Sequence, residues 1–194
     1  MSSLWLVSLE VCVLTVAHSG AGADTVGIAM RSVLYYLSIN PAVVAKLQKE
    51  IDALDSSESI SFRQTQQLPY LKAVVRESLR MYSSVPAQLY RIVPDGGLSV
   101  DGHFIPPGTI VGMCSLAQNR DTAIFGQDVD VFKPDRWLGD EARGRYLENA
   151  LFNFGGTGPR SCPGRDLAMV SQSSSVCSSV VLDANFCRLS CTSL

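Results

Sequence analysis

A single cysteine in a glycine-rich segment constrains this chain more than any other feature. Residues 154–164 read FGGTGPRSCPG, and Cys162 stands two positions before the final glycine, Gly164. Glycines let backbone N–H groups turn toward a sulfur atom and lower its basicity, which suits a thiolate that ligates a metal. A helix that begins after Gly164 would also place its positive dipole end near this sulfur. The alternative is a glycine-rich turn with an incidental cysteine, because such turns are common.

The bulk composition allows a buried core and excludes few partners. The chain has 194 residues, of which 46% are hydrophobic, and its formal net charge is −2. This length suits one sizeable domain or two small ones. The charge gives no electrostatic reason to expect nucleic acid as a partner. The six cysteines form no CxxC pair and no Cys/His cluster with zinc spacing, so their number alone decides little.

The N-terminal segment is apolar over residues 4–17 and leads into the small residues 19–23. This pattern is similar to a signal peptide, but no lysine or arginine precedes it and Glu10 interrupts it. The apolar run is also shorter than the roughly 20 residues that span a bilayer. We therefore expect a buried helix here and no membrane anchor in the chain. A secreted, disulfide-rich protein is the weaker alternative.

Helical periodicity and turn signals predict a mainly α chain with a small β-sheet. Residues 4–39 form a long apolar stretch, and apolar residues recur at helical spacing over residues 41–54 and from Pro69 to Tyr82. Short apolar runs that are separated by Gly- and Pro-containing turns predict strands at residues 88–93, 98–100 and 109–113. A helix is expected to start near Arg165. Residues 171–194 are rich in serine and cysteine without clear periodicity, which predicts a disordered tail.

Two further motifs carry charged or hydroxyl side chains. Glu77 and Arg80 lie on one helix face at positions i and i+3, and Arg136 could complete a buried Glu–Arg–Arg cluster with them. Asp24 and Thr25 follow small residues within the first helix, where a helix can open locally and a carboxylate and hydroxyl can relay protons. The simpler alternatives are a surface ion pair and a helix kink with solvent-facing side chains.

The order and spacing of these motifs resemble the cytochrome P-450 family of haem-thiolate monooxygenases. The resemblance covers roughly residues 10–170 and includes segments 68–71, 101–108 and 117–121, and it is closest to fungal members. It implies the C-terminal portion of the family's fold, incomplete. Residues 1–170 would form a partial domain, from the central helix through the cysteine loop, and residues 171–194 an atypical tail.

The resemblance also implies a role for each matching residue. Cys162 would be the proximal ligand of the haem iron, in a loop shaped by Phe154, Gly158 and Gly164. Arg91 and Arg160 would contact the haem propionates, and residues 85–90 would line part of the substrate pocket. Asp24 and Thr25 would deliver protons. Glu77, Arg80 and Arg136 would form a structural cluster that supports the loop.

The implied reaction is the insertion of one oxygen atom from O2 into a small apolar substrate. Heme b would be the cofactor, electrons would come from NADPH through a reductase, and secondary metabolism would be the setting. Full-length relatives are expected at the endoplasmic reticulum membrane.

The sequence departs from the family pattern in three ways. Phe154 stands eight residues before Cys162 instead of seven, the chain has less than half the family's length, and the tail is atypical. A truncated, non-catalytic remnant of such an enzyme is therefore the alternative.

Overall fold

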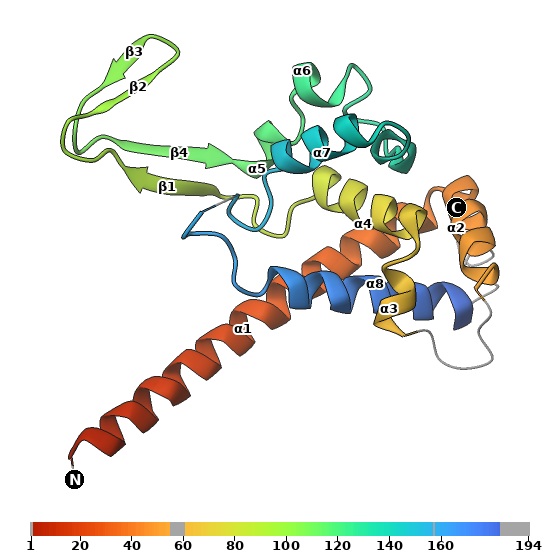
Figure 1. Cartoon of the computed structure of the whole chain (residues 1–194), viewed down its shortest axis with the longest axis horizontal. Helices are drawn as coiled ribbons and strands as arrows, with labels where there is room; N and C mark the ends of the chain where they lie inside the picture. Colours follow the sequence, from red (N-terminus) through yellow and green to blue (C-terminus); the bar gives the residue numbers. More distant parts are fainter. Residues whose placement is uncertain (1, 55–60, 157, 183–194) are drawn as a thin grey trace.

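The computed structural model describes residues 2–54, 61–156 and 158–182. Long helices and two small hairpins make up most of it, which confirms the predicted α+β class (Figure 1). In chain order the elements are α1 (Ser2–Ser38), α2 (Pro41–Asp52), α3 (Phe62–Thr65), α4 (Pro69–Met81), β1 (Gln88–Ile92), β2 (Leu98–Val100), β3 (His103–Ile105), β4 (Ile110–Cys114), α5 (Ser115–Gln118), α6 (Thr122–Phe125), the 3₁₀ helix η1 (Pro134–Trp137), α7 (Glu141–Ala150) and α8 (Arg165–Leu182).

The helix starts follow from local chemistry. Pro41 and Pro69 open α2 and α4, where a missing N–H costs nothing because the first turn has no acceptor for it. The carboxylate of Glu50 in α2 accepts hydrogen bonds from the main-chain N–H groups of Tyr70 (2.7 Å) and Leu71 (2.9 Å). This carboxylate satisfies two free donors at the start of α4 and joins the two helices.

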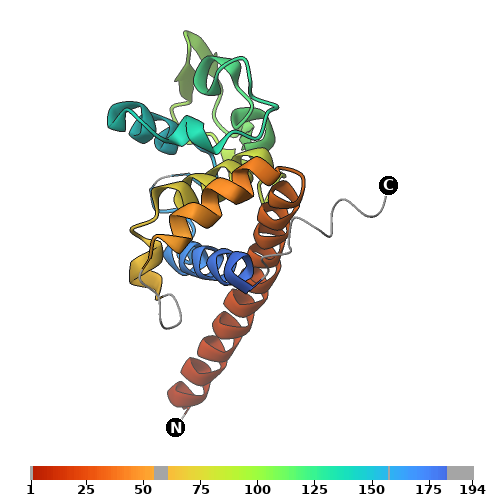
Figure 2. The ribbon, with the colours of Figure 1, turned by 90° about the vertical axis from the view of Figure 1, so that its right-hand side faces the viewer.

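Helix α1 is continuous across its small residues, which differs from the expected local opening near Gly22. The hydroxyl of Thr25 donates a 2.8 Å hydrogen bond to the Ala21 carbonyl oxygen one turn earlier, and the helix runs unbroken from Ser2 to Ser38. Glycine in a helix interior costs only about 1 kcal/mol. The other residues of this 37-residue helix offset that cost, so the helix stays continuous. Figures 1 and 2 show its N-terminal half extending away from the other helices.

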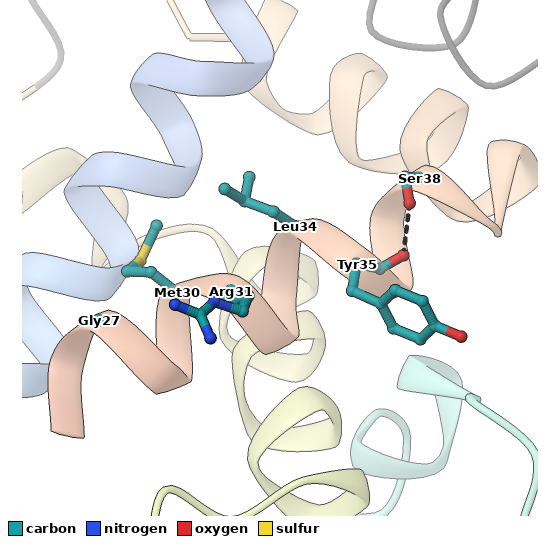
Figure 3. Close-up of a pocket in the computed structure, with 6 residues that line it drawn as sticks. All are labelled: Gly27, Met30, Arg31, Leu34, Tyr35 and Ser38. Carbon is teal, nitrogen blue, oxygen red and sulfur yellow. Dashed lines mark hydrogen bonds between the residues drawn. The ribbon is translucent and has the colours of Figure 1, made fainter. Parts of the chain in front are cut away.

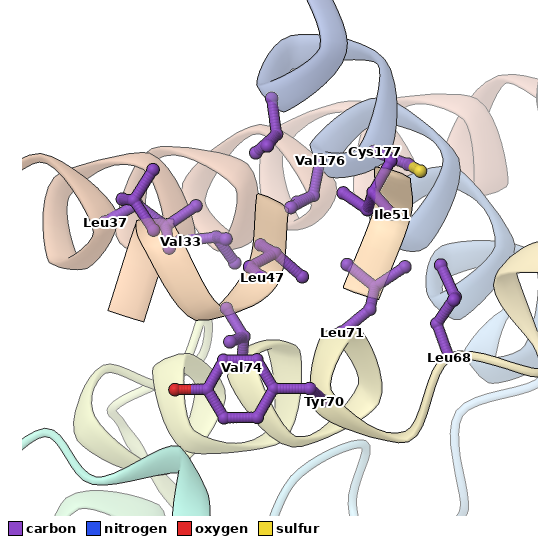
Figure 4. Packing of buried hydrophobic residues seen from close by; sticks show 12 residues of the cluster. Val33, Leu37, Leu47, Ile51, Leu68, Tyr70, Leu71, Val74, Val176 and Cys177 are labelled. Atoms are coloured by element: carbon purple, nitrogen blue, oxygen red, sulfur yellow. The ribbon is translucent and has the colours of Figure 1, made fainter. Parts of the chain in front are cut away.

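The main core lies where α1, α2, α4 and α8 meet (Figure 4). Val33 and Leu37 of α1 face Leu47 and Ile51 of α2, and Leu71 and Val74 of α4 close the group. All six side chains are at most 2% exposed. The helical spacing read from the sequence therefore predicted the buried positions Leu47 and Ile51 of α2 and Leu71 and Val74 of α4, whereas the face of α1 came from the structure.

Helix α8 corrects the expectation of a disordered tail from residue 171. It continues to Leu182, and Val176, Cys177 and Val180 are buried in the main core. Figures 1 and 2 show α8 lying beside α1. Gln172 and Ser173 are also buried, each 1% exposed. Serine has only a moderate helix propensity, so contacts with neighbouring helices decide whether a serine-rich segment is helical. Residues 183–194 lie outside the described part of the chain.

The strands form an arm that projects away from the helices (Figure 1). β1 pairs antiparallel with β4, from Gln88 opposite Cys114 to Ile92 opposite Ile110. β2 pairs with β3 at the tip. Gly97 precedes this tip with a φ of +78°, and a Cβ atom there would lie 2.4 Å from the Phe104 ring. The turn therefore requires glycine.

Within the described ranges, no single helix has the length and apolarity to cross a bilayer. The segments Ser19–Ser38 and Pro41–Asp52 meet the length and composition test only as a pair, and they are bent by 106° at their junction.

Candidate functional site

The cysteine of the glycine-rich segment lies in an exposed loop between α7 and α8. The main chain turns after residue 153 with positive φ at Phe154 (56°), Gly155 (79°) and Gly156 (76°). The N–H of Cys162 then donates a 2.7 Å hydrogen bond to the carbonyl oxygen of Phe154, which closes the loop. The Cys162 side chain is exposed and carries a free thiol. The loop therefore presents its sulfur outside the protein core.

Gly155 is required by the shape of this loop. A Cβ atom there would lie 2.8 Å from the carbonyl oxygen of Arg160, so a larger residue would force the two sides of the loop apart. The predicted Gly158 has a φ of +92°, and a Cβ atom on Gly164 would lie 3.8 Å from the Cys162 sulfur. Gly155 was not predicted, because adjacent glycines in a sequence do not reveal which one faces the opposite side of a loop.

The ring of Phe154 attaches the loop to the helices. It is half-buried and packs on Ala29 of α1 and on Val75 and Leu79 of α4. A cavity of about 130 Å³ adjoins the ring, and Met169 is among the residues that line it. The additional residue before Cys162 thus leaves Phe154 packed on the helices, while its contact with a haem stays a prediction.

Glu77 of α4 is the centre of a buried ion cluster. Its Oε1 accepts hydrogen bonds of 2.9 Å from Arg80 Nη2, Arg136 Nε and the main-chain N–H of Lys133. Its Oε2 accepts from Arg80 Nε (2.9 Å) and from the indole Nε1 of Trp137 (2.8 Å). The side chains of Glu77 and Arg80 are 0% exposed, and that of Arg136 is 6% exposed. The structure therefore brings the three predicted cluster residues together: both arginines pair with the Glu77 carboxylate, and two neutral N–H groups complete its hydrogen bonds.

Arg136 extends the cluster to an outer carboxylate. Its Nη1 donates to Asp128 Oδ1 (3.0 Å) and to the Phe125 carbonyl oxygen (2.7 Å). A hydrogen bond from Lys133, followed by one from Arg136, lowers the pKa of Asp128 to about 2. Asp128 and Trp137 were not predicted as members, because their contacts depend on how the irregular segment 126–137 folds back on α4.

Replacing Asp128 with asparagine should reveal this pairing through its pH dependence. The pKa of an unfolded aspartate is about 3.9, so the ionised group stabilises the native state above about pH 4 and the gain is lost as the pH falls toward 2. We expect less than about 1 kcal/mol, because the side chain is 37% exposed and solvent screens it. Urea unfolding of both proteins should give free energies that differ at about pH 6 and converge near pH 2. A difference independent of pH would contradict the pairing.

The predicted proton-delivery pair lies on α1. Asp24 is exposed and Thr25 is half-buried. The Thr25 carbonyl oxygen accepts a 2.8 Å hydrogen bond from the hydroxyl of Ser84, in the loop that follows α4. Ser84 was not predicted either; its contact fixes this part of α1 relative to residues 85–90, the predicted edge of a substrate pocket.

The two arginines that were predicted to contact haem propionates are both exposed. Arg91 lies in β1, where its Nη1 donates a 2.7 Å hydrogen bond to the neighbouring Tyr90 carbonyl oxygen. Arg160 lies in the cysteine loop. In the described part of the chain, no hydrogen bond or ion pair joins Cys162, Arg91, Arg160 and the Asp24–Thr25 pair. The structure thus places these residues on three parts of the chain: Cys162 and Arg160 in the cysteine loop, Arg91 in β1, and Asp24 and Thr25 on α1.

A larger groove of about 580 Å³ lies on one face of α1 (Figure 3). Its lining comes from that helix alone, and the hydroxyl of Ser38 donates to the Tyr35 carbonyl oxygen within it (2.7 Å). Met30 points toward α8 at one end. The groove contains none of the predicted site residues. Its size therefore says nothing about the chemistry of Cys162.

Comparison with known proteins gives a consistent match. The model of the family described as Cytochrome P-450 matches residues 7–180. A pisatin demethylase of Fusarium vanettenii is 41% identical over 157 residues, which are 81% of this chain and 30% of the relative.

Two further fungal relatives are named cytochrome P-450 monooxygenases. The one from Aspergillus flavus is 38% identical over 77% of this chain and 30% of its own length. The one from Emericella nidulans is 38% identical over 80% of this chain and 32% of its own length. The chain thus spans about a third of the length of these relatives.

Proposed function

The chain belongs to the cytochrome P-450 family, and on this premise we propose that it provides the haem-binding loop of a monooxygenase, which inserts one oxygen atom from O2 into a small apolar substrate. The observation that carries this proposal is the exposed thiol of Cys162 on a loop closed by its own N–H bond to Phe154. A thiol presented in this way is accessible to a flat metal cofactor that lies against the loop.

The residues present fit a haem on the side of Cys162. The thiolate is a soft ligand that suits haem iron. Gly164 has no side chain beside the sulfur; a Cβ atom there would lie in ordinary contact with it, at 3.8 Å.

The other residues would bind and orient the cofactor. The guanidinium groups of Arg91 and Arg160 are exposed and would pair with the haem propionates through charge-assisted hydrogen bonds. A bound haem would supply the oxygen chemistry, with electrons from NADPH through a reductase. Glu77, Arg80 and Arg136 would support the loop from within the protein.

Thr25 and Asp24 would route protons from the α1 side. The Thr25 hydroxyl uses its proton in the bond to Ala21, and its oxygen retains lone pairs that can accept from a water or a ligand. The exposed carboxylate of Asp24 can exchange protons with solvent. In such a relay the Thr25 hydroxyl would turn from the Ala21 carbonyl oxygen to donate its proton to the bound ligand. It would take a replacement proton from a solvent water held near Asp24, so that its oxygen stays neutral.

Spectroscopy of the haem-supplied chain tests the proposal. We expect the protein to take up haem and, when reduced under carbon monoxide, to show the Soret band of a thiolate-ligated haem. Replacing Cys162 with serine should abolish that band, because a serine hydroxyl is not ionised at neutral pH and is a poor iron ligand. The fold should stay intact, since the side chain is exposed.

The matched control is Cys114→Ser, which changes another free cysteine and preserves a donor to the Pro86 carbonyl oxygen. This variant should retain the band. Failure of the unmodified chain to take up haem would sink the proposal and favour a non-catalytic remnant.

A further inference from the structure

Asn119 is a fully buried residue that links the ion cluster to the cysteine loop. It follows α5 and is 0% exposed. Its main-chain carbonyl oxygen accepts a 3.0 Å hydrogen bond from Arg80 Nη1. Its side-chain Oδ1 accepts a 2.8 Å hydrogen bond from the main-chain N–H of Phe152. Within the described ranges, Asn119 is the one residue bonded both to the ion cluster and to the segment that leads into the loop.

The two bonds of Asn119 serve different purposes because they use different parts of the residue. Arg80 needs only the main-chain oxygen, which any residue at this position would provide. The side-chain amide is free to bond the loop segment, through Oδ1 to Phe152 and through Nδ2 to Asn153 Oδ1 at a long 3.4 Å. The contact with the loop segment therefore requires the side-chain amide of Asn119, whereas the contact with the cluster requires only its main chain.

Phe152 connects the Asn119 side chain to the residues that hold the Cys162 sulfur. Phe152 stands two residues before Phe154, whose carbonyl oxygen accepts the N–H of Cys162. The other hydrogen bonds of this segment are local, from Asn153 to Leu151 and from Gly156 to Asn153. The bond to Asn119 thus joins the loop to the segment after α5, which is hydrogen-bonded to Arg80 of the ion cluster.

We infer that Asn119 is a positioning residue, which fixes the cysteine loop relative to the Glu77 cluster and thereby the direction of the Cys162 sulfur. The consequence for haem ligation rests on the proposed function. The hydrogen bond between Asn119 and Phe152 belongs to the chain itself, so its effect on the loop can be measured without a cofactor.

The test is residue-resolved amide hydrogen exchange of the whole chain without haem. In Asn119→Leu the bond to Arg80 stays and the bond to Phe152 is lost, so the Phe152 and Cys162 amides should exchange about tenfold faster. The Lys133 amide, which bonds to Glu77, should keep its rate within about twofold. Asn119→Asp retains an acceptor oxygen and should restore slow exchange at Phe152. Gln118→Leu, which also replaces a side-chain amide with leucine at the preceding residue, is the matched control.

Two results would overturn the inference. One is unchanged exchange at Phe152 in Asn119→Leu; the other is an equal rise at Phe152 and Lys133, which would mean that Asn119 supports the fold in general. Asn119→Ser, which is polar and too short to reach Phe152, takes the place of the leucine variant if the latter does not fold.

A second readout uses haem. In the reduced, carbon monoxide-bound protein, a smaller fraction of the haem in Asn119→Leu should show the Soret band of thiolate ligation. Asn119→Asp should restore that fraction. Equal shares in all three proteins would refute the effect on the sulfur. If the unmodified chain takes up no haem, the proposed function fails, while the exchange rates still decide whether Asn119 holds the loop.

Discussion

Replacing Glu77 with alanine is expected to prevent the chain from reaching its native fold. The change removes the acceptor for five hydrogen bonds. It leaves Arg80 buried without its carboxylate partner, and it leaves Arg136 paired with Asp128 only. Breaking a buried ion pair from one side costs about 3–5 kcal/mol. Small domains are stable by only about 5–15 kcal/mol in total. Urea unfolding followed by circular dichroism should therefore show little or no cooperative transition in this variant.

The control for this variant is Glu141→Ala on α7. The Glu141 side chain is 87% exposed and pairs with Arg145 at i+4 across 3.3 Å, an arrangement that contributes about 0.3–0.5 kcal/mol. Its unfolding curve should nearly overlay that of the unmodified chain. A Glu77→Ala variant that unfolds at the same urea concentration as Glu141→Ala would show that the cluster does not stabilise the fold.

Ending the chain after Val170 is expected to have an effect of similar size. This truncation removes the part of α8 that buries Val176, Cys177 and Val180, each at most 4% exposed. Burial of a valine-sized side chain contributes about 1.5–3 kcal/mol, and the loss would also expose the facing surfaces of Leu47 and Leu71. We expect a loss on the order of 5 kcal/mol in the free energy of unfolding.

The comparison for this truncation is a chain that ends after Leu182, which retains all of α8. Thermal unfolding should give a cooperative transition for the longer chain and a broad or absent one for the shorter. If both unfold at the same temperature, α8 does not belong to the core. The result thus separates the observed structure from the expectation of a disordered tail.

Local patterns in the sequence were sufficient for much of the fold. The helical spacing of Val44, Leu47 and Ile51 predicted the buried face of α2, because an amphipathic helix shows its core side directly in its sequence. Turn residues likewise predicted the strands of the arm. The exact extent of the arm's tip, with the strand β3, came only from the structure.

The ion cluster shows where such reasoning ends. Glu77 and Arg80 are close in sequence, so their contact follows from helix geometry. Trp137 and Asn119 reach the same cluster from segments about 60 and 40 residues away, and a short-range pattern contains no information on such contacts. Only the path of the main chain places their polar atoms within hydrogen-bonding distance.

The turn of the cysteine loop could be read from the sequence, because its glycines, its two prolines and Cys162 act through main-chain geometry over a few residues. The tertiary structure decided which polar residues are buried. Ser173 and Gln172 read as part of a solvated tail, yet they lie at 1% exposure between helices. Burial is a property of surfaces that meet from distant parts of a chain, so the packing of α8 against α1 and α4 became visible only once the chain was folded.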